Sequence, residues 1–348
     1  MNISEQLYPS YIRDYENVNY IKHDGSVAVI MRTKDRPILL ARALKSVLEQ
    51  EYQNWHLYLI NDGGNKKSVE DLVNIYASSF DGRLTLLHNE KSLGMEAASN
   101  KGFELASEEF IVVHDDDDSW TPQFLQKTTN FLKENKHAVA VITNCVVIHE
   151  EITNNYVQET ARYEWGYWRD DVDISILLKG NITPPICLLI RMDVAKSIGP
   201  FNADLPVLGD WDYNLRLFRC GEILTLDEKL AFYHHRVNAT SIYGNSVHAG
   251  VNKHKLYAIR YKNALVRKSF QESQGNYGLL QILLLEQDKN LNEIRKLANQ
   301  LGNSIEHLNQ QLMLSNQEVK KILNERVTIY NRIRLLIRKI RRWKKQKS

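Results

Sequence analysis

The chain has 348 residues, of which 43% are hydrophobic and 25% are charged, so it has the composition of a folded protein with room for one or two domains. This composition excludes a disordered or collagen-like chain. The formal net charge of +3 is unevenly distributed, because residues 332–348 hold nine Lys or Arg and no acid, which leaves the preceding 331 residues at −6. We therefore expect an acidic body with a basic end.

The sequence carries no signal for secretion or for crossing a membrane. It contains no stretch of about 18 apolar residues, and its first 20 residues lack a basic segment followed by an apolar one. Cys145, Cys187 and Cys220 are far apart and outside any zinc-binding spacing, so we expect them to be reduced core residues. The sequence therefore predicts a cytoplasmic protein.

Short β-branched runs alternate with stretches of helical periodicity from Val27 onward. Such alternation is typical of an α/β fold in which helices cover a Rossmann-like, mostly parallel sheet. Residues 1–25 precede this pattern, show no clear period and are expected to form an N-terminal arm. Strands are expected at 27–31, 55–60, 83–87 and 110–114, and helices at 37–50, around 68–78 and at 95–106.

The middle of the chain has a less regular pattern. Pro is tolerated in the first turn of a helix, and Gly often follows the last turn, so these residues suggest helix ends. Three further elements are expected: a helix beginning at Thr121-Pro122, a β-rich segment at 138–148, and a helix from Asp210 to Cys220 closed by Gly221.

The third part of the chain, residues 276–331, is expected to be a long helix. An apolar heptad repeat starts at Ile294 and continues for seven heptads without a proline, with polar residues only at Ser315 and Arg326. The repeat favours a self-associating coiled coil, a dimer or a trimer, over an amphipathic helix folded back on the body. The seam consists of Ile294, Ala298, Leu301, Ile305, Leu308, Leu312, Ser315, Val319, Ile322, Arg326, Ile329, Ile333, Leu336, Ile340 and Trp343.

The basic end, residues 332–348, continues this pattern as an amphipathic tail with nine cations around an apolar face. A helix of this kind binds the surface of an anionic membrane, and the same charge would attract nucleic acid. Because no recognised nucleic-acid module accompanies the tail, we expect a membrane partner and no nucleic acid. The protein is then expected to associate peripherally with the inner face of the cell membrane.

Four consecutive aspartates, Asp115 to Asp118, follow the expected strand at 110–114. Neighbouring carboxylates repel one another, and oxygen ligands of this kind suit Mg²⁺ or Mn²⁺. In an extended stretch Asp115 and Asp117 share a face, and Asp116 and Asp118 point the other way. The alternative is a solvated acidic turn that caps the next helix. Ligands of open α/β sheets bind where the strands end, which favours the metal site.

Four segments of the sequence together resemble glycosyltransferase family 2, which has the GT-A fold. The resemblance covers roughly residues 26–240 and implies a GT-A domain at 26–270. It also implies an inverting transfer of a sugar from a nucleotide-sugar donor, with a divalent metal at an Asp-x-Asp motif. The segments are VAVIMRTKDRPILLARALKSVLEQEYQNWHLYLINDGG, NEKSLGMEAASNKGFELA, EEFIVVHDDDDSW and LGDWDYNLRL.

Carried over by position, the resemblance implies that a set of polar residues and one glycine binds the donor. Thr33, Asp35 and Arg36 follow the first expected strand, and Asp62, after the second, would contact the base. Asp35 and Asp62 are also residues that turns commonly use. The complete donor-binding set is Thr33, Asp35, Arg36, Asp62, Gly94, Asn100, Asp115, Asp116 and Arg236.

The same resemblance implies that Asp117 is the main metal ligand, with Asp118 beside it. The segment Tyr233-His234-His235-Arg236 comes where the family often places a His or Arg near the donor phosphates. His235 is assigned to the metal and Arg236 to the pyrophosphate, although the register leaves open which of these side chains makes which contact.

The general base is expected at Asp210. In the family an acidic pair, usually Glu-Asp, carries the base, and here Gly209 occupies the Glu position. Asp212 lies four residues before Arg216 and is expected to pair with it on the surface. A helix N-terminus lowers the pKa of a carboxylate, so burial beside Trp211 must offset this effect for Asp210 to act as a base.

We expect a metal-dependent glycosyltransferase that modifies a glycan or lipid-linked acceptor in surface polysaccharide synthesis. One alternative is a sugar nucleotidyltransferase, which would need a Gly-rich loop after the first strand, but MRTKDRP contains no Gly. Another alternative is a non-catalytic coiled-coil scaffold, against which the Asp cluster and Asp210 both argue. The sugar, the nucleotide, the acceptor and the linkage are not determined by the sequence.

Overall fold

The computed structural model describes residues 22–153, 156–166, 168–236, 243–244, 251–272 and 275–346. The chain divides into two compact units between Lys262 and Asn263, and each is described by itself. Most of the expected N-terminal arm, residues 1–21, lies outside the described residues.

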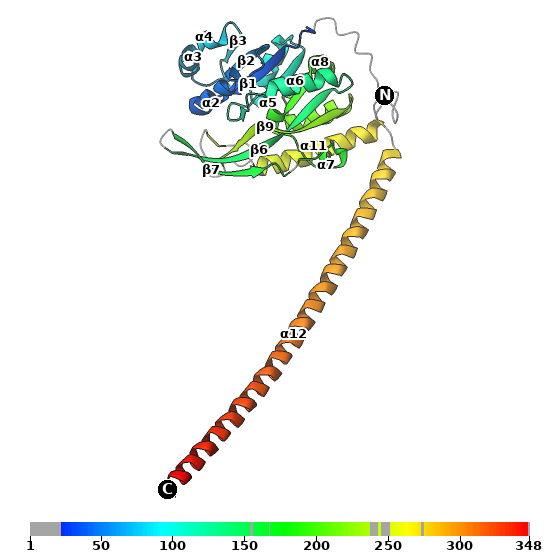
Figure 1. The fold of residues 1–348 in the computed structure, drawn as a ribbon. Coiled ribbons are helices and arrows are strands. Elements are labelled where there is room, and N and C mark those ends of the chain that lie inside the picture. Colours follow the sequence, from blue (N-terminus) through cyan, green and yellow to red (C-terminus); the bar gives the residue numbers. More distant parts are fainter. Residues whose placement is uncertain are drawn as a thin grey trace. The chain divides into compact units, whose positions relative to one another are not determined.

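Nine strands of the described chain form one sheet in the first unit (Figure 1). The sheet has the strand order β3-β2-β1-β4-β8-β6-β9-β5, and β7 pairs with β6. The strands are β1 (Val27–Thr33), β2 (Trp55–Asp62), β3 (Leu84–Asn89), β4 (Phe110–Val113), β5 (Ser119–Trp120), β6 (Ala140–Thr153), β7 (Tyr156–Glu164), β8 (Leu188–Arg191) and β9 (Ile223–His235).

The α/β fold is confirmed, and its sheet is mixed. The strands β1 to β4 pair in parallel, as the alternation of strands and helices predicts. Beyond them β8 runs antiparallel to both β4 and β6, while β9 is parallel to β6. The direction of these later strands depends on long connections, for which the local apolar pattern carries no signal.

Helices of the first unit cover both faces of the sheet. Because side chains alternate along a strand, Val29 of β1 packs in one core cluster and Ile30 in the other. The first cluster includes residues of α2 and α6, and the second includes residues of α5, α8 and α9. The helices are α2 (Pro37–Leu48), α3 (Lys66–Ile75), α4 (Ala77–Phe80), α5 (Met95–Leu105), α6 (Phe124–Glu134), α7 (Ile174–Leu177), α8 (Met192–Ile198) and α9 (Gly209–Phe218). The boundary between the two units falls within α11 (Val251–Glu272).

One predicted helix start is wrong by two residues. Helix α6 begins at Phe124 and not at Thr121-Pro122. The backbone N–H of Thr121 donates to Leu230 next to the β5–β9 pair, and the carbonyl of Pro122 accepts from Glu51. These long-range hydrogen bonds hold the segment outside the helix. Cys145, Cys187 and Cys220 are buried and are not joined by disulfide bonds in the described part of the chain, as expected.

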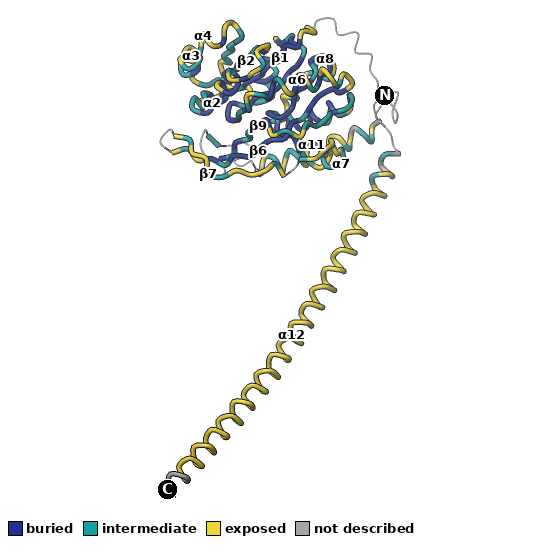
Figure 2. Tube along the Cα trace, in the orientation of Figure 1, coloured by how far each residue is buried: buried dark blue, intermediate teal, exposed yellow. Residues whose placement is uncertain are grey.

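The second unit contains α12 (Gly275–Gln346), a single helix of 72 residues. At 1.5 Å per residue such a helix is roughly 110 Å long. The apolar residues of the heptad seam are exposed along it, with Leu301 at 63% and Leu312 at 61% (Figure 2). The long helix is confirmed, and its pairing in a coiled coil stays a prediction. The side chain of Trp343 lies outside the described residues.

None of the described helices, α12 included, joins sufficient length to sufficient apolar character to cross a membrane.

Candidate active site

A cavity of about 500 Å³ opens where β1, β2 and β4 end. The segment after β1 contributes Thr33, Asp35 and Arg36 to its lining, and Asp117 and Asp210 also line it. These two carboxylates are 93 positions apart in the sequence, yet the fold brings them to one cavity. Two carboxylates from distant parts of the sequence therefore face one cavity.

Three of the four consecutive aspartates form a cluster that suits a cation. Each of Asp115, Asp117 and Asp118 offers an oxygen, and these atoms lie within 4.8 Å of one another. The Oδ2 atom of Asp118 is buried and has no hydrogen-bond partner among the described residues. Oxygen atoms in this arrangement fit Mg²⁺ or Mn²⁺.

The cluster differs in one respect from the extended arrangement that the sequence suggests. A turn at residues 116–117, closed by the hydrogen bond from the N–H of Asp118 to the carbonyl of Asp115 (3.2 Å), brings Asp118 to the same side as Asp115 and Asp117. Asp116 is fully buried away from the cavity lining, where it forms an ion pair with Arg36. The alternation expected of a strand therefore fails at this turn.

Arginines neutralise most of the charge of these carboxylates. Arg32 pairs with Asp115 at 2.8 Å, and both Arg36 and Arg236 pair with Asp117. Burial alone would raise the pKa of Asp117, but the two arginines hold it below its ordinary value. Burial raises the pKa of Asp118 well above its ordinary value, and the charges of Asp117 and Asp115 raise it further. A cation near Asp118 would favour its ionised form.

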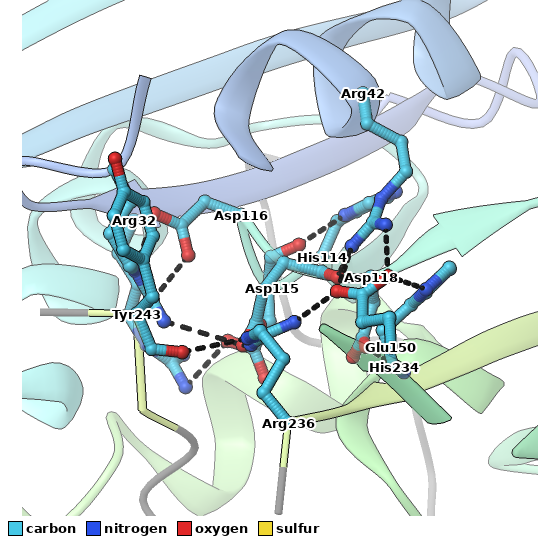
Figure 3. A network of polar contacts seen from close by, with 12 residues as sticks. Arg32, Arg42, His114, Asp115, Asp116, Asp118, Glu150, His234, Arg236 and Tyr243 are labelled. Atoms are coloured by element: carbon cyan, nitrogen blue, oxygen red, sulfur yellow. Dashed lines mark hydrogen bonds and ion pairs between the residues drawn. The ribbon is translucent and has the colours of Figure 1, made fainter. Parts of the chain in front are cut away.

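Behind the cluster lies a buried network centred on Glu150 (Figure 3). Its carboxylate accepts hydrogen bonds from Arg42, from Arg236 and from Nδ1 of His234, the last at 2.8 Å. Burial opposes ionisation of Glu150, but the hydrogen bonds from His234 and Arg42 hold its pKa well below the ordinary value. Because Arg236 contacts both Glu150 and Asp117, the network fixes the arginine at the edge of the cluster.

The sequence leaves open which of His234, His235 and Arg236 contacts the metal or the phosphates, and the three residues have different surroundings in the structure. Arg236 contacts Asp117, and the backbone N–H of His234 donates to Asp118 at 2.8 Å. His235 lies outside the carboxylate cluster. Its ring packs against Tyr233, with ring centroids 4.3 Å apart. Its assignment as a metal ligand therefore stays a prediction without geometric support.

Other residues expected to bind the donor have protein partners of their own. The carboxylate of Asp62 accepts hydrogen bonds from Asn89, Ser92 and the backbone at Leu93 and Gly94. Burial would raise the pKa of Asp62, but these donors lower it. Asp62 thus fixes the loop before α5. The N-cap residue of α5 is Gly94, with a φ of 96°.

Asp35 and Asn100 make contacts that fix the backbone near the cavity. Asp35 has a left-handed φ of 54° and accepts from the N–H of Asn65 at 2.8 Å, which is the turn role that Asp often takes. Asn100 is not part of the cavity lining. Its side-chain amide exchanges two hydrogen bonds with the backbone of Phe201, at 2.8 and 2.9 Å, and so ties α5 to that segment.

Asp210 is the second residue of α9 and lines the cavity. Its two oxygens accept from Nδ2 of Asn181 at 2.7 Å and from the N–H of Trp211 at 2.8 Å. Burial raises the pKa of Asp210, and this effect outweighs the opposing hydrogen bond from Trp211 and the charge of Arg32. The carboxylate therefore keeps more affinity for a proton than its position at a helix N-terminus would suggest.

Asp212 pairs with Arg216 as predicted, but Asp212 is buried and not on the surface as expected. The ion pair is 2.9 Å long, and the hydroxyl of Tyr261 donates to the other carboxylate oxygen at 2.8 Å. Asp212 is buried and is absent from the cavity lining. It therefore has a structural role in fixing α9.

Sequence reasoning does not identify Arg32, Arg42, Glu96 or Glu150. Glu150 follows the apolar run of the β-rich segment, and an acid at the end of such a run is its only sequence signal. Arg42 lies within an amphipathic helix, where a cation on a solvated face is common. Their roles depend on contacts with residues far away in the chain.

His114, which precedes the aspartates, makes the stability of the first unit depend on pH. It is fully buried, with Nδ1 beside the carbonyl of Asp115 and Nε2 beside Oγ of Ser46. Burial lowers the pKa of His114 to about 4. In the unfolded chain, the imidazole of His114 takes up a proton below about pH 6.5. The stability that the folded protein gains from keeping His114 neutral is therefore fully present above that pH. It is lost as the pH falls to about 4.

We therefore expect the free energy of unfolding to fall by about 2 kcal/mol between pH 7 and pH 5 because of His114 alone. Urea unfolding of the wild type and of His114→Gln at both pH values measures this difference. The difference between the free energies of unfolding at the two pH values should be about 2 kcal/mol smaller in His114→Gln than in the wild type. Equal pH dependence in the wild type and His114→Gln would contradict the assignment.

The mixed sheet and the helices that cover it form a GT-A fold. The crystal structure of S. aureus TarS 1-349 in complex with UDP-GlcNAc superimposes on the chain with a TM-score of 0.51 and 16% sequence identity. The superposition covers 62% of this chain and 60% of the TarS chain. The GT-A fold that the sequence resemblance implies is therefore confirmed.

Residues 28–199 match the family model described as Glycosyl transferase family 2. This part of the chain belongs to that family. A PGL/p-HBAD biosynthesis glycosyltransferase of Mycobacterium bovis (strain BCG / Pasteur 1173P2) is 26% identical over 199 residues, which are 57% of this chain and 72% of the relative.

Another relative is the Escherichia coli (strain K12) protein WcaA, provisionally named a colanic acid biosynthesis glycosyl transferase. It is 37% identical over 105 residues, which are 30% of this chain. The match spans 37% of the length of WcaA. Residues 28–199 therefore match glycosyltransferase family 2, and the relatives of the chain include proteins named for colanic acid and PGL/p-HBAD biosynthesis.

Proposed function

We propose that this protein transfers a sugar, with inversion, from a nucleotide-sugar donor to a hydroxyl of a glycan or a lipid-linked acceptor. The observation that carries the proposal is that Asp117 and Asp210 line one cavity. Surface polysaccharide synthesis is the process that the resemblance to WcaA supports.

In this reaction Asp210 acts as the general base. It takes the proton of the acceptor hydroxyl while the hydroxyl oxygen forms a bond to the anomeric carbon of the donor sugar. The bond between that carbon and the diphosphate oxygen breaks, and its electrons leave with the nucleoside diphosphate. A single displacement of this kind inverts the anomeric carbon. The raised pKa of Asp210 supports the role, because it strengthens the carboxylate as a base.

The donor side of the cavity would hold the diphosphate. Asp115, Asp117 and Asp118 are the residues that would hold Mn²⁺ or Mg²⁺, an ion that supplies positive charge to the departing diphosphate. Arg36 and Arg236, which both reach Asp117, add positive charge on the same side. The remaining proposed donor contacts in the cavity lining are Thr33, Asp35, Asp62 and Gly94.

A screen of UDP-sugars and GDP-sugars with Mn²⁺ or Mg²⁺ tests this function. Release of nucleoside diphosphate, dependent on the metal, is the expected result, followed by linkage analysis of the product. A sugar nucleotidyltransferase would instead consume a nucleoside triphosphate and a sugar phosphate. A non-catalytic scaffold would release no nucleoside diphosphate from any donor.

We also propose that α12 pairs with α12 of a second or third copy of the chain. The apolar residues of its seam are exposed along the described helix, and burying them against an identical seam would remove that area from water. Sedimentation of the full chain should give a dimer or a trimer, and Leu312→Glu on the seam should shift it toward the monomer.

The basic end of α12 is proposed to hold the protein on the inner face of the cell membrane. We expect a chain truncated after residue 325 to bind anionic phosphatidylglycerol vesicles about 100-fold more weakly or worse, because each nearby cation contributes roughly 1 kcal/mol. Transfer to a soluble acceptor should survive the truncation. Vesicle flotation and an activity assay measure the two effects.

A matched control separates charge from helix length. It keeps the full chain and replaces the nine Lys and Arg of residues 332–348 with Gln. This variant should also fail to bind the vesicles, because it lacks the positive charges that attract anionic lipid. Unchanged vesicle binding by both variants would exclude the membrane role of the tail.

A further inference from the structure

Glu96 is a buried acid in the first turn of α5 that the proposed mechanism does not use. It is 8% exposed and lines the same cavity as Asp210. Its carboxylate lies against the first residue of α9: a Cβ added to Gly209 would come within 2.3 Å of Oε1 and 2.2 Å of Cγ of Glu96. Glu96 therefore fills the space that a side chain at 209 would occupy, immediately next to Asp210.

The Glu96 side chain occupies the space beside residue 209. The backbone of Gly209 is outside the left-handed region, so its own conformation does not require glycine. A Cβ at position 209 would force the Glu96 side chain, which arrives from another helix, to move from its present place. The Glu96 carboxylate is thus held between Gly209 and the cavity that Asp210 also lines.

The surroundings of Glu96 leave it available to a ligand. Backbone N–H groups of Gly209 and of Glu96 itself interact with its carboxylate. Arg32 attracts Glu96, but its guanidinium hydrogen-bonds Ser99 and pairs with Asp115. A buried carboxylate is costly unless donors satisfy it, so a donor from the substrate would stabilise it.

We propose that Glu96 accepts a hydrogen bond from an acceptor hydroxyl next to the one that Asp210 deprotonates. The acceptor is then a polyol with two neighbouring hydroxyls at its reacting end, such as a sugar ring, because two carboxylates side by side repel a phosphate at this position. Glu96 contacts the acceptor and takes no proton. This inference rests on the proposed glycosyl transfer and specifies its acceptor.

The inference is tested by removing the carboxylate at position 96 and by placing one at position 209 instead. The probes are the UDP-sugar or GDP-sugar that the wild type hydrolyses and a panel of p-nitrophenyl glycosides with their deoxy analogues. Glu96→Ala should raise KM for the glycoside about 10- to 100-fold, the effect of losing a hydrogen bond to a charged group. Its KM for the donor and its rate of donor hydrolysis in water should change little.

The double variant Glu96→Ala with Gly209→Glu restores a carboxylate at the same place from the other helix. It should recover most of the lost affinity for the glycoside, whereas Gly209→Glu alone should fail because Glu96 occupies its space. The matched control Glu96→Ala with Gly209→Ala fills part of the space without a charge and should not recover. A deoxy glycoside that lacks the neighbouring hydroxyl should not discriminate between the wild type and Glu96→Ala.

The outcomes separate this inference from the function on which it rests. A wild type that turns over no donor refutes the glycosyl transfer itself. A wild type that hydrolyses a donor but glycosylates none of the polyol probes overturns the inference alone. An unchanged glycoside KM in Glu96→Ala, or equal recovery by both double variants, would assign Glu96 a purely structural role.

Discussion

Replacing Asp210 with Asn is expected to lower the rate of sugar transfer by about 10³-fold while nucleotide binding is retained. Asn has the same size and can still accept a hydrogen bond from Asn181 or Trp211, so the fold of α9 should persist. It cannot take a proton from the acceptor hydroxyl. Initial rates with the donor from the screen and calorimetric titration with the nucleoside diphosphate measure the two effects.

Asp212→Asn is the matched control for this variant. Asp212 lies on the same helix but outside the cavity lining, and its partners are Arg216 and Tyr261. Its replacement should lower the free energy of unfolding and leave the rate of the folded enzyme close to that of the wild type. Near-normal turnover by Asp210→Asn would refute the assignment of the base.

Removing the carboxylate of Asp117 is expected to have the second large effect. Asp117→Asn should weaken Mn²⁺ binding by about 100-fold or more, because the cluster loses one of its three charged oxygen ligands. Transfer activity should fall with it, since the departing diphosphate loses the charge that stabilises it. Electron paramagnetic resonance of free Mn²⁺ during titration measures the affinity directly.

Asp116→Asn provides the control within the same run of aspartates. Asp116 is buried against Arg36 and does not belong to the cation cluster, so its replacement should leave Mn²⁺ affinity largely unchanged. Both variants alter the carboxylates around Arg36, and only Asp117→Asn removes a proposed metal ligand. Equal Mn²⁺ affinity in the two variants would argue against a metal site at Asp117.

The local elements of the first half of the chain could be predicted because their causes are local. A β-branched run such as that of β1 and the apolar stripe of α2 depend on side-chain periodicity, which is written in consecutive residues. The strand order beyond β4 could not be predicted in this way. There β8 pairs antiparallel with both β4 and β6, and no periodicity encodes which strand will be a neighbour.

The candidate site was predictable in part for a related reason. Asp117 and Asp210 belong to short motifs whose residues are close together in the sequence, so both could be named from it. Packing determines the turn that adds Asp118 to the cluster. It also determines the contact between Glu150 and Arg236, which are 86 positions apart in the sequence. Hydrogen bonds over such separations leave no mark in a local pattern.

The sequence by itself determined the α/β class of the first unit, the long helix of the second and the residue types available for metal binding and proton transfer. These follow from composition, spacing and periodicity, which act within a few turns of chain. Only the tertiary structure decided that Asp117 faces the same cavity as Asp210, and that Glu96 fills the space beside Gly209. Both depend on which helices and strand ends meet in space, because burial and close contact are properties of the packed molecule.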